Sequence, residues 1–210
     1  MFRKVLLLAG IVVLASSAVA KADTIGPGNC GSCLGSSYTL SYATTANPNV
    51  FDVTLVINAT GFTNSSSDRL NSVSLKLSSS TPTASLITAP AGFNTTVSGG
   101  LNANGCSGAA SGFFCSENSG LGLQVGHAGD IYTFVWAVTV GAPGNLFTGD
   151  DQASVKALYV NTDGRANGIT SEEITLDPGT TSTVPEPGSL VLLGTGILGA
   201  AGAIKRRLSA

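Results

Sequence analysis

The chain has 210 residues, of which 43% are hydrophobic and only 10% are charged. This composition excludes a disordered polyelectrolyte, because such chains combine high charge with low hydrophobicity. With 10 basic and 12 acidic residues, the chain has no basic excess that would bind nucleic acid, so we expect no nucleic-acid partner. The length allows one ordinary domain with appendages.

Residues 1–22 have the pattern of a secretory signal peptide. Arg3 and Lys4 precede an uncharged apolar run at residues 5–14, and small residues follow. This order is typical of a signal peptide, and the run is too short to span the roughly 30 Å hydrocarbon core of a membrane comfortably. We predict cleavage after Ala22, which would leave Asp23 first, and cleavage after Ala20 fits nearly as well.

Residues 23–183 form the predicted exported domain. They contain four basic and eleven acidic residues, a formal charge of −7, whereas the whole chain has a formal charge of −2. An acidic surface favours solubility and disfavours polyanionic partners. Cations and neutral glycans remain as partners compatible with this charge.

Apolar and polar residues alternate with period two along this domain. The clearest stripes cover residues 51–59, 73–77 and 132–140. Further strands are predicted at residues 38–42, 153–160 and 172–176, with weaker candidates at 85–87 and 95–98. Gly, Pro, Asn and Ser separate these segments. The pattern predicts an all-β fold, an antiparallel β-sandwich or jelly-roll-like body.

Residues 99–129 break the alternation. They contain nine glycines and two of the four cysteines. We predict long loops here, with one short strand at most. Loops of this length are uncommon unless they are functional, covalently stapled or mobile.

The four cysteines are Cys30, Cys33, Cys106 and Cys115. Behind a signal peptide they would enter an oxidising compartment, where an even number usually means disulfides. Of the three possible pairings we favour Cys30–Cys33 with Cys106–Cys115. A redox site at the first pair would need a preceding strand and a following helix, and a zinc site from all four would need reduced thiolates.

Calcium is a weaker alternative to a protein without cofactors. The candidate oxygen ligands are Asp150, Asp151 and the segment 161–164 together with Glu172 or Glu173. The spacing of that segment is not that of an EF-hand. Asp163-Gly164 instead predicts a hairpin turn, so we expect no metal.

No catalytic constellation stands out in the sequence. His127 is the only histidine, in a glycine-flanked loop, and no Gly-x-Ser-x-Gly motif marks a nucleophile. Two carboxylate pairs, Glu117 with Asp130 and Glu172 with Asp150, would suit glycoside hydrolysis only if the fold placed their carboxylates about 5–10 Å apart. The adjacent Phe113 and Phe114 are the best candidates for sugar stacking, although we expect them in the core.

The end of the chain carries a second apolar segment. Residues 190–204 contain no charge, and Lys205, Arg206 and Arg207 follow directly. As a helix the segment would cover about 23 Å, so spanning a membrane requires local thinning and snorkelling of the basic side chains. Basic clusters stay on the cytoplasmic side. We therefore predict a transmembrane helix with the body outside the cytoplasm.

The tripeptide Pro185-Glu186-Pro187 precedes this segment. Together with the helix and the basic tail it makes residues 184–210 resemble the PEP-CTERM sorting signal of exported bacterial proteins. In that family the tag is recognised and cut by exosortase, a membrane protease. The resemblance therefore implies exosortase as a partner, and it implies a surface or extracellular-matrix role near exopolysaccharide or in biofilm. It implies nothing about the chemistry of the body.

These observations predict a non-enzymatic structural protein. It would be tethered to the inner membrane with its body outside and then sorted to the cell surface or extracellular matrix. The alternative is a carbohydrate-binding module or a carbohydrate-active hydrolase on the same β-sandwich fold, because fold alone does not decide function.

Overall fold

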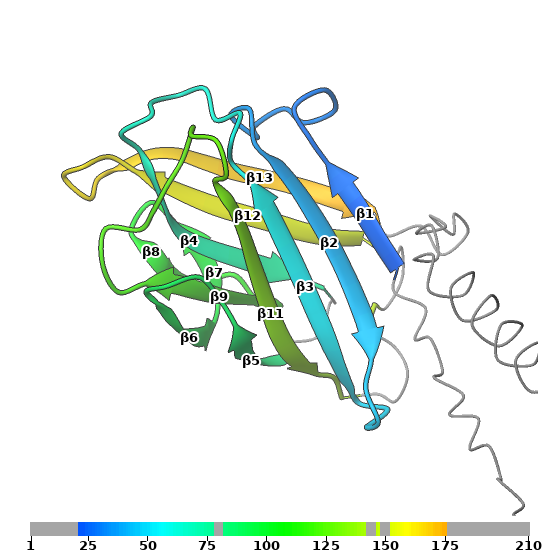
Figure 1. The fold of residues 1–210 in the computed structure, drawn as a ribbon. Helices are drawn as coiled ribbons and strands as arrows, with labels where there is room; N and C mark the ends of the chain where they lie inside the picture. The colour runs from blue at the N-terminus through cyan, green and yellow to red at the C-terminus, as the bar shows by residue number, and fades with distance from the viewer. Residues whose placement is uncertain (1–20, 78–81, 142–145, 148–151, 176–210) are drawn as a thin grey trace, which may run out of the picture.

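The computed structural model describes residues 21–77, 82–141, 146–147 and 152–175 (Figure 1). Every element in this part of the chain is a β-strand. Most of the predicted signal peptide, the sorting tripeptide, the membrane segment and the basic tail lie outside the described residues. The domain boundaries that we drew at 22/23 and 183/184 therefore stay predictions.

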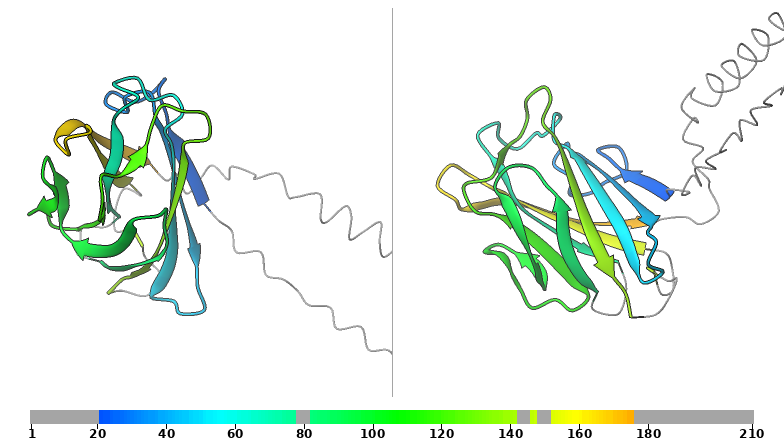
Figure 2. Two further views of the ribbon diagram at one scale, coloured as in Figure 1. Left: turned by 60° about the vertical axis from the view of Figure 1, so that its left-hand side comes forward. Right: turned by 60° about the horizontal axis from the view of Figure 1, so that its bottom comes forward.

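Two antiparallel sheets face each other as two layers (Figure 2). The first sheet has the strand order β1–β2–β3–β11–β5. Its strands are β1 (Lys21–Ile25), β2 (Ser37–Thr44), β3 (Val50–Asn58), β11 (Ile131–Thr139) and β5 (Thr83–Thr88). This architecture confirms the all-β, antiparallel prediction.

The second sheet has the order β13–β12–β4–β9–β6, with β10 also paired to β4. Its strands are β13 (Ala166–Thr175), β12 (Gln152–Val160), β4 (Arg69–Lys76), β9 (Phe113–Asn118), β6 (Phe93–Ser98) and β10 (Leu123–Gln124). A separate hairpin consists of β7 (Gly100–Asn102) and β8 (Gly105–Gly108). The chain crosses between the layers repeatedly, for example from β3 to β4 and from β11 to β12.

The predicted apolar stripes meet between the two layers. In β3 the buried and partly buried residues alternate from one end of the strand to the other. In β11 the inward side chains Phe134, Trp136 and Val138 are fully buried. Because side chains alternate between the faces of a strand, the opposite stripes face away from this core.

Trp136 joins the layers at the centre of the core. Its indole is parallel to the ring of Phe134, with centroids 5.6 Å apart, and meets Phe114 of the second sheet edge-on at 5.5 Å. The indole Nε1 donates a 3.0 Å hydrogen bond to Ser116 Oγ on β9. The buried N–H therefore has the partner that such a group needs.

Two tyrosines form a polar link through the same core. The hydroxyls of Tyr38 on β2 and Tyr159 on β12 lie 2.6 Å apart, and Tyr38 also donates to Thr170 Oγ1 on β13. Burial raises the pKa of both phenols, and for Tyr38 the neighbouring Tyr159 raises it further. Both hydroxyls therefore stay protonated at neutral pH.

The second sheet is covered on both faces. Period-two alternation places Ser72 and Ser74 opposite the core, yet both are buried. A second apolar cluster lies on this outer side, and it consists of Leu101, Cys115, Leu158 and Val160. Leu101 belongs to the β7–β8 hairpin, so the hairpin folds over the outer face of the sheet and hides polar residues there.

The prediction of long loops at residues 99–129 was wrong. Four strands, β7 to β10, lie in this segment, and β9 is an interior strand of the second sheet. The glycines supply turns rather than a flexible loop; for example Gly112, with φ of 80°, directly precedes β9. The last strand also begins at Ala166, earlier than the predicted residue 172.

Candidate functional site

Ala22 and Asp23, which flank the preferred signal-peptide cleavage position, lie in the edge strand β1. They pair with Ser41 and Leu40 of β2. Cleavage after Ala22 would leave only residues 23–25 of this strand, whereas cleavage after Ala20 would leave all of it. The position of the cut stays a prediction.

The first disulfide joins Cys30 and Cys33 in the loop between β1 and β2. This is the pairing that we favoured. The strand β2 follows the loop, so the helix that a thioredoxin-like site needs at this position is not formed. The disulfide instead shapes a tight loop that packs against β13.

Ser32, inside that loop, makes a dense set of hydrogen bonds to β13. Its backbone N–H and its hydroxyl both donate to Glu172 Oε1 at 2.6 Å. Its carbonyl accepts from Thr170 Oγ1 at 3.0 Å, and its Oγ accepts from the backbone N–H of Ser171 at 3.0 Å. The loop therefore covers the free edge of β13, where unpaired backbone groups would otherwise be exposed.

The second disulfide, Cys106–Cys115, was also the favoured pairing, and it attaches the β7–β8 hairpin to β9. Two residues further along β9, Glu117 Oε2 accepts the backbone N–H of Cys106 at 3.1 Å. The carboxylate packs so closely that a Cβ on Gly105 would lie 2.5 Å from Glu117 Oε1. One covalent and one polar attachment therefore fix the hairpin on the outer face of the sheet.

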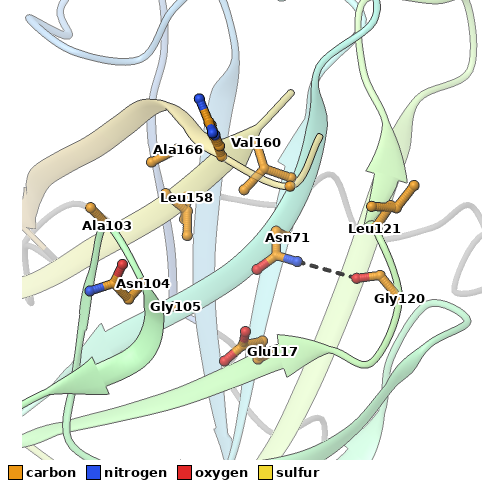
Figure 3. A pocket seen from close by; sticks show the side chains of 12 residues that line it. Asn71, Ala103, Asn104, Gly105, Glu117, Gly120, Leu121, Leu158, Val160 and Ala166 are labelled. Atoms are coloured by element: carbon orange, nitrogen blue, oxygen red, sulfur yellow. Dashed lines mark hydrogen bonds between the residues drawn. The ribbon is translucent and has the colours of Figure 1, made fainter. Parts of the chain in front are cut away.

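A hollow of about 590 Å³ opens beside this hairpin (Figure 3). Its walls are the β7–β8 hairpin, the β9–β10 loop and the β12–β13 turn, and its floor includes Leu158 and Val160. The polar lining side chains are Asn71, Asn104, Glu117 and Arg165, and the exposed Leu121 forms one rim. Figure 3 shows Asn71, Asn104, Glu117 and Leu121 around one common space.

This groove combines hydrogen-bonding groups with apolar surface. One carboxylate, one guanidinium and two amides supply acceptors and donors, while the exposed Leu121 supplies apolar contact area above the buried Leu158 and Val160. Such a mixture suits an uncharged, hydroxyl-bearing ligand. Among the described lining residues Glu117 is the only acid, whereas glycoside hydrolysis uses two carboxylates. The sequence contained no signal for this groove, because its residues come from segments that are far apart in the chain.

The adjacent Phe113 and Phe114 do not form a sugar-stacking platform. Only 7% and 1% of their surfaces are exposed. The ammonium groups of Lys156 and Lys76 lie 4.8 and 6.0 Å from the centroid of the Phe113 ring. These cations cover the face of the Phe113 ring in a second hollow of about 590 Å³, which Glu173 also lines. The alternative of an exposed aromatic pair for sugar stacking was therefore wrong, and the expectation that both rings are buried is confirmed.

His127 pairs with Asp130 in the turn directly before β11. Asp130 Oδ2 accepts the His127 backbone N–H at 2.8 Å and lies 3.2 Å from the imidazole Nδ1. Tyr132 donates to Gln124 O, and its hydroxyl lies 3.3 Å from Asp130 Oδ1. Burial, with the Asp130 charge as a second cause, raises the pKa of Tyr132 to about 12. These contacts stabilise the turn at residues 127–130.

The calcium candidates do not converge in the described residues. Asn161 Oδ1 accepts the backbone N–H groups of Asp163 and Arg165, and the Gly164 N–H donates to Asn161 O, so the predicted hairpin turn is formed. Glu172 is bound to the Cys30–Cys33 loop. Asp150 and Asp151 lie outside the described residues.

A buried carboxylate that no sequence pattern marks directly precedes β4. Asp68 is 1% exposed, and both of its oxygens accept from Asn167 Nδ2 at 2.8–2.9 Å. Asn64 Nδ2 donates to it as well, at 3.1 Å. These bonds tie the β3–β4 loop to the start of β13, so Asp68 has a structural role.

Within the described ranges, no group of three or more His, Cys, Asp or Glu side chains is placed to hold a metal ion. In the same part of the chain, no helix has the length and hydrophobicity needed to cross a membrane. The predicted membrane helix at residues 190–204 falls outside that part.

The chain carries a PEP-CTERM protein-sorting motif at residues 183–207, where a family model of that description matches. A tag of this kind implies an exported protein whose sorting signal is processed by exosortase, a membrane protein. The body has no other family assignment. No curated protein and no solved structure matches the chain.

Proposed function

We propose that the chain is a non-enzymatic structural protein of the cell surface or extracellular matrix. Its body is held outside the inner membrane by residues 190–204 until exosortase processes the tag. The observation that carries this proposal is the sorting motif at residues 183–207, behind an acidic β-sandwich with two disulfides. Oxidised cysteines are typical of proteins outside the cytoplasm.

The use of the carboxylates supports a structural rather than a catalytic body. Glu117, Asp130 and Glu172 are candidate catalytic acids from the sequence, and each accepts a backbone N–H, from Cys106 in β8, His127 and Ser32 respectively. A charge-assisted bond of this kind is among the stronger hydrogen bonds in proteins. These three side chains therefore fix the loops around the sandwich.

The sorting proposal is tested by deleting Pro185, Glu186 and Pro187 in the producing bacterium. We expect the variant to accumulate uncut in the inner-membrane fraction, while the unchanged protein is processed and leaves it. The matched control deletes residues 179–181, which lie outside the motif, and should be processed normally. Unchanged processing of the first variant would contradict recognition of the tripeptide.

Glycan binding is the second candidate, and the groove lined by Asn104, Glu117 and Arg165 favours it. A surface protein with such a site would bind neutral exopolysaccharide. The test is a glycan array probed with the exported protein, with Arg165→Ala as the variant and Thr162→Ala in the same turn as the control. Binding that is weakened only by Arg165→Ala supports the site, and absence of any glycan signal contradicts it.

A further inference from the structure

The distribution of charge along the chain is uneven. From residue 77 to residue 116 the sequence contains no Asp, Glu, Lys, Arg or His, although the domain as a whole is acidic. This stretch includes β5 and β6 in full. The strand next to β5, β11, also lacks charged residues.

The strands β5 and β6 are the last strands of their sheets on the same side of the sandwich. They are consecutive in the chain and lie against each other (Figure 1). We call this surface, Thr83–Thr88 with Phe93–Ser98, the charge-free edge. On the opposite side of the sandwich, the Cys30–Cys33 loop covers β13 through Ser32 and Glu172.

The charge-free edge exposes large β-branched side chains. Ile87 on β5 is 55% exposed and Val97 on β6 is 46% exposed. The same two strands also expose hydroxyl and amide side chains, among them Thr83, Ser85 and Asn94. Apolar side chains exposed among polar ones offer surface that a partner can cover.

The backbone of this edge disfavours simple strand addition. The register of β5 on β11 shifts near Ile87, and that of β6 on β9 shifts between Phe93 and Thr96. Such irregularities are one way in which proteins prevent continuous edge-to-edge pairing. A partner would therefore contact the side chains rather than extend the sheet.

We propose that the charge-free edge is a self-association surface that contacts a second copy of this chain. Two copies of an acidic domain repel each other over most of their surfaces, and this edge is where they can meet without opposing charges. The exposed Ile87 and Val97 of both copies would be removed from water in the contact.

The dimensions of the edge predict a weak contact. A six-residue strand is about 20 Å long, and the two sheets are separated by about 10 Å. This patch is smaller than the roughly 800 Å² per partner that stable complexes bury. The association therefore becomes populated where copies are crowded together, as on a surface or in a matrix.

The test is photocrosslinking of the full-length chain in the producing bacterium. Two copies with different epitope tags are coexpressed, and Ile87 is replaced by photoreactive benzoylphenylalanine. We expect an adduct that contains both tags and has twice the mass of one copy. The same probe at Ile169, which is 39% exposed on β13, should give no such adduct.

A charge substitution then separates the surface from the fold. Val97→Lys, combined with the probe at Ile87, should reduce the mixed adduct at least about tenfold, because like charges brought face to face strongly disfavour association. Ile169→Lys is the matched control and should leave the adduct unchanged. Both variants should keep both disulfides, as measured by intact mass.

The proposal is overturned if the probe at Ile87 gives no mixed adduct, reacts only with another protein or a glycan, or reacts no more than the probe at Ile169. Persistence of the adduct in Val97→Lys would also overturn it. None of these outcomes alters the sorting assay with residues 185–187, so failure of self-association and failure of sorting are distinguishable.

Discussion

Asp68 shows at the scale of one residue how this acidic domain accommodates a buried charge. The side-chain amides of Asn64 and Asn167 donate to its carboxylate. A charged hydrogen bond contributes more to stability than a neutral one, and losing one partner leaves the others unsatisfied. The carboxylate therefore holds two distant segments of the chain together.

We predict that Asp68→Asn lowers the free energy of unfolding by roughly 1–3 kcal/mol, because an amide N–H₂ would face the amide donors. Urea denaturation of the exported protein with its disulfides intact measures this change. Asp163→Asn, in the exposed β12–β13 turn, is the control and should be nearly neutral. Equal effects of the two variants would argue against a structural role for Asp68.

The tyrosine pair predicts a loss of stability in alkali. Tyr38 and Tyr159 have a raised pKa in the folded state because they are buried, whereas in the unfolded chain their pKa is about 10. Below that pH both states are protonated and the pair gives no pH dependence. Above it only the unfolded state loses these protons, so the free energy of unfolding falls as the pH rises.

Thermal unfolding from pH 8 to pH 11 checks this prediction. The melting temperature should fall more steeply above about pH 10, and Tyr38→Phe should make that fall shallower. A curve with the same slope in both proteins would mean that the pair does not ionise on unfolding.

At the scale of elements, each of several loops is fixed to a sheet by a small number of strong contacts. Cys106–Cys115 and Glu117 hold the β7–β8 hairpin, and Ser32 holds the loop before β2. The hairpin covers the outer face of the second sheet and forms one wall of the groove. The shape of the groove therefore depends on these attachments.

Replacing both Cys106 and Cys115 by Ala should cost about 2–3 kcal/mol, because a short closed ring in the unfolded chain is lost. Protease cleavage within residues 100–112 should also become faster, since the hairpin would lose its covalent attachment and keep its non-covalent contacts, the hydrogen bond to Glu117 and the packing of Leu101. The paired variant Cys30→Ala with Cys33→Ala is the control, and it should leave this segment protected. Equal cleavage in both variants would contradict a local role for the disulfide.

The sequence predicted these elements unevenly. Period-two stripes such as residues 51–59 identified the strands that face the core, because half-buried strands carry that pattern. The period-two pattern did not identify β9, because Phe113, Phe114 and Cys115 are consecutive in that strand and all three are buried. A strand covered on both faces has no alternation to detect, and the surrounding glycines suggested a loop.

The candidate site could be predicted only where it depended on local sequence. The sorting motif and the two disulfide pairings follow from short spacings that remain visible in the linear chain. The groove does not, because Asn71, Glu117 and Arg165 come together only after the second sheet and its hairpin have formed. Asp68 was overlooked for the same reason, since its partner Asn167 lies on β13, far from it in the sequence.

At the scale of the whole molecule, the C-terminal motif carries sorting information and the described middle of the chain is a disulfide-linked β-sandwich. The motif at residues 183–207 implies export and processing by exosortase. The acidic sandwich keeps two disulfides, one covered sheet edge and one charge-free edge. Together these features suit the proposed role of a structural protein outside the cytoplasm.

Intact-mass analysis of the protein recovered from the producing bacterium tests this account most directly. We expect a species that lacks the signal peptide and the basic tail, with Cys30, Cys33, Cys106 and Cys115 all unavailable to alkylation until reduced. A cytosolic species that retains both ends and carries four free thiols would contradict it.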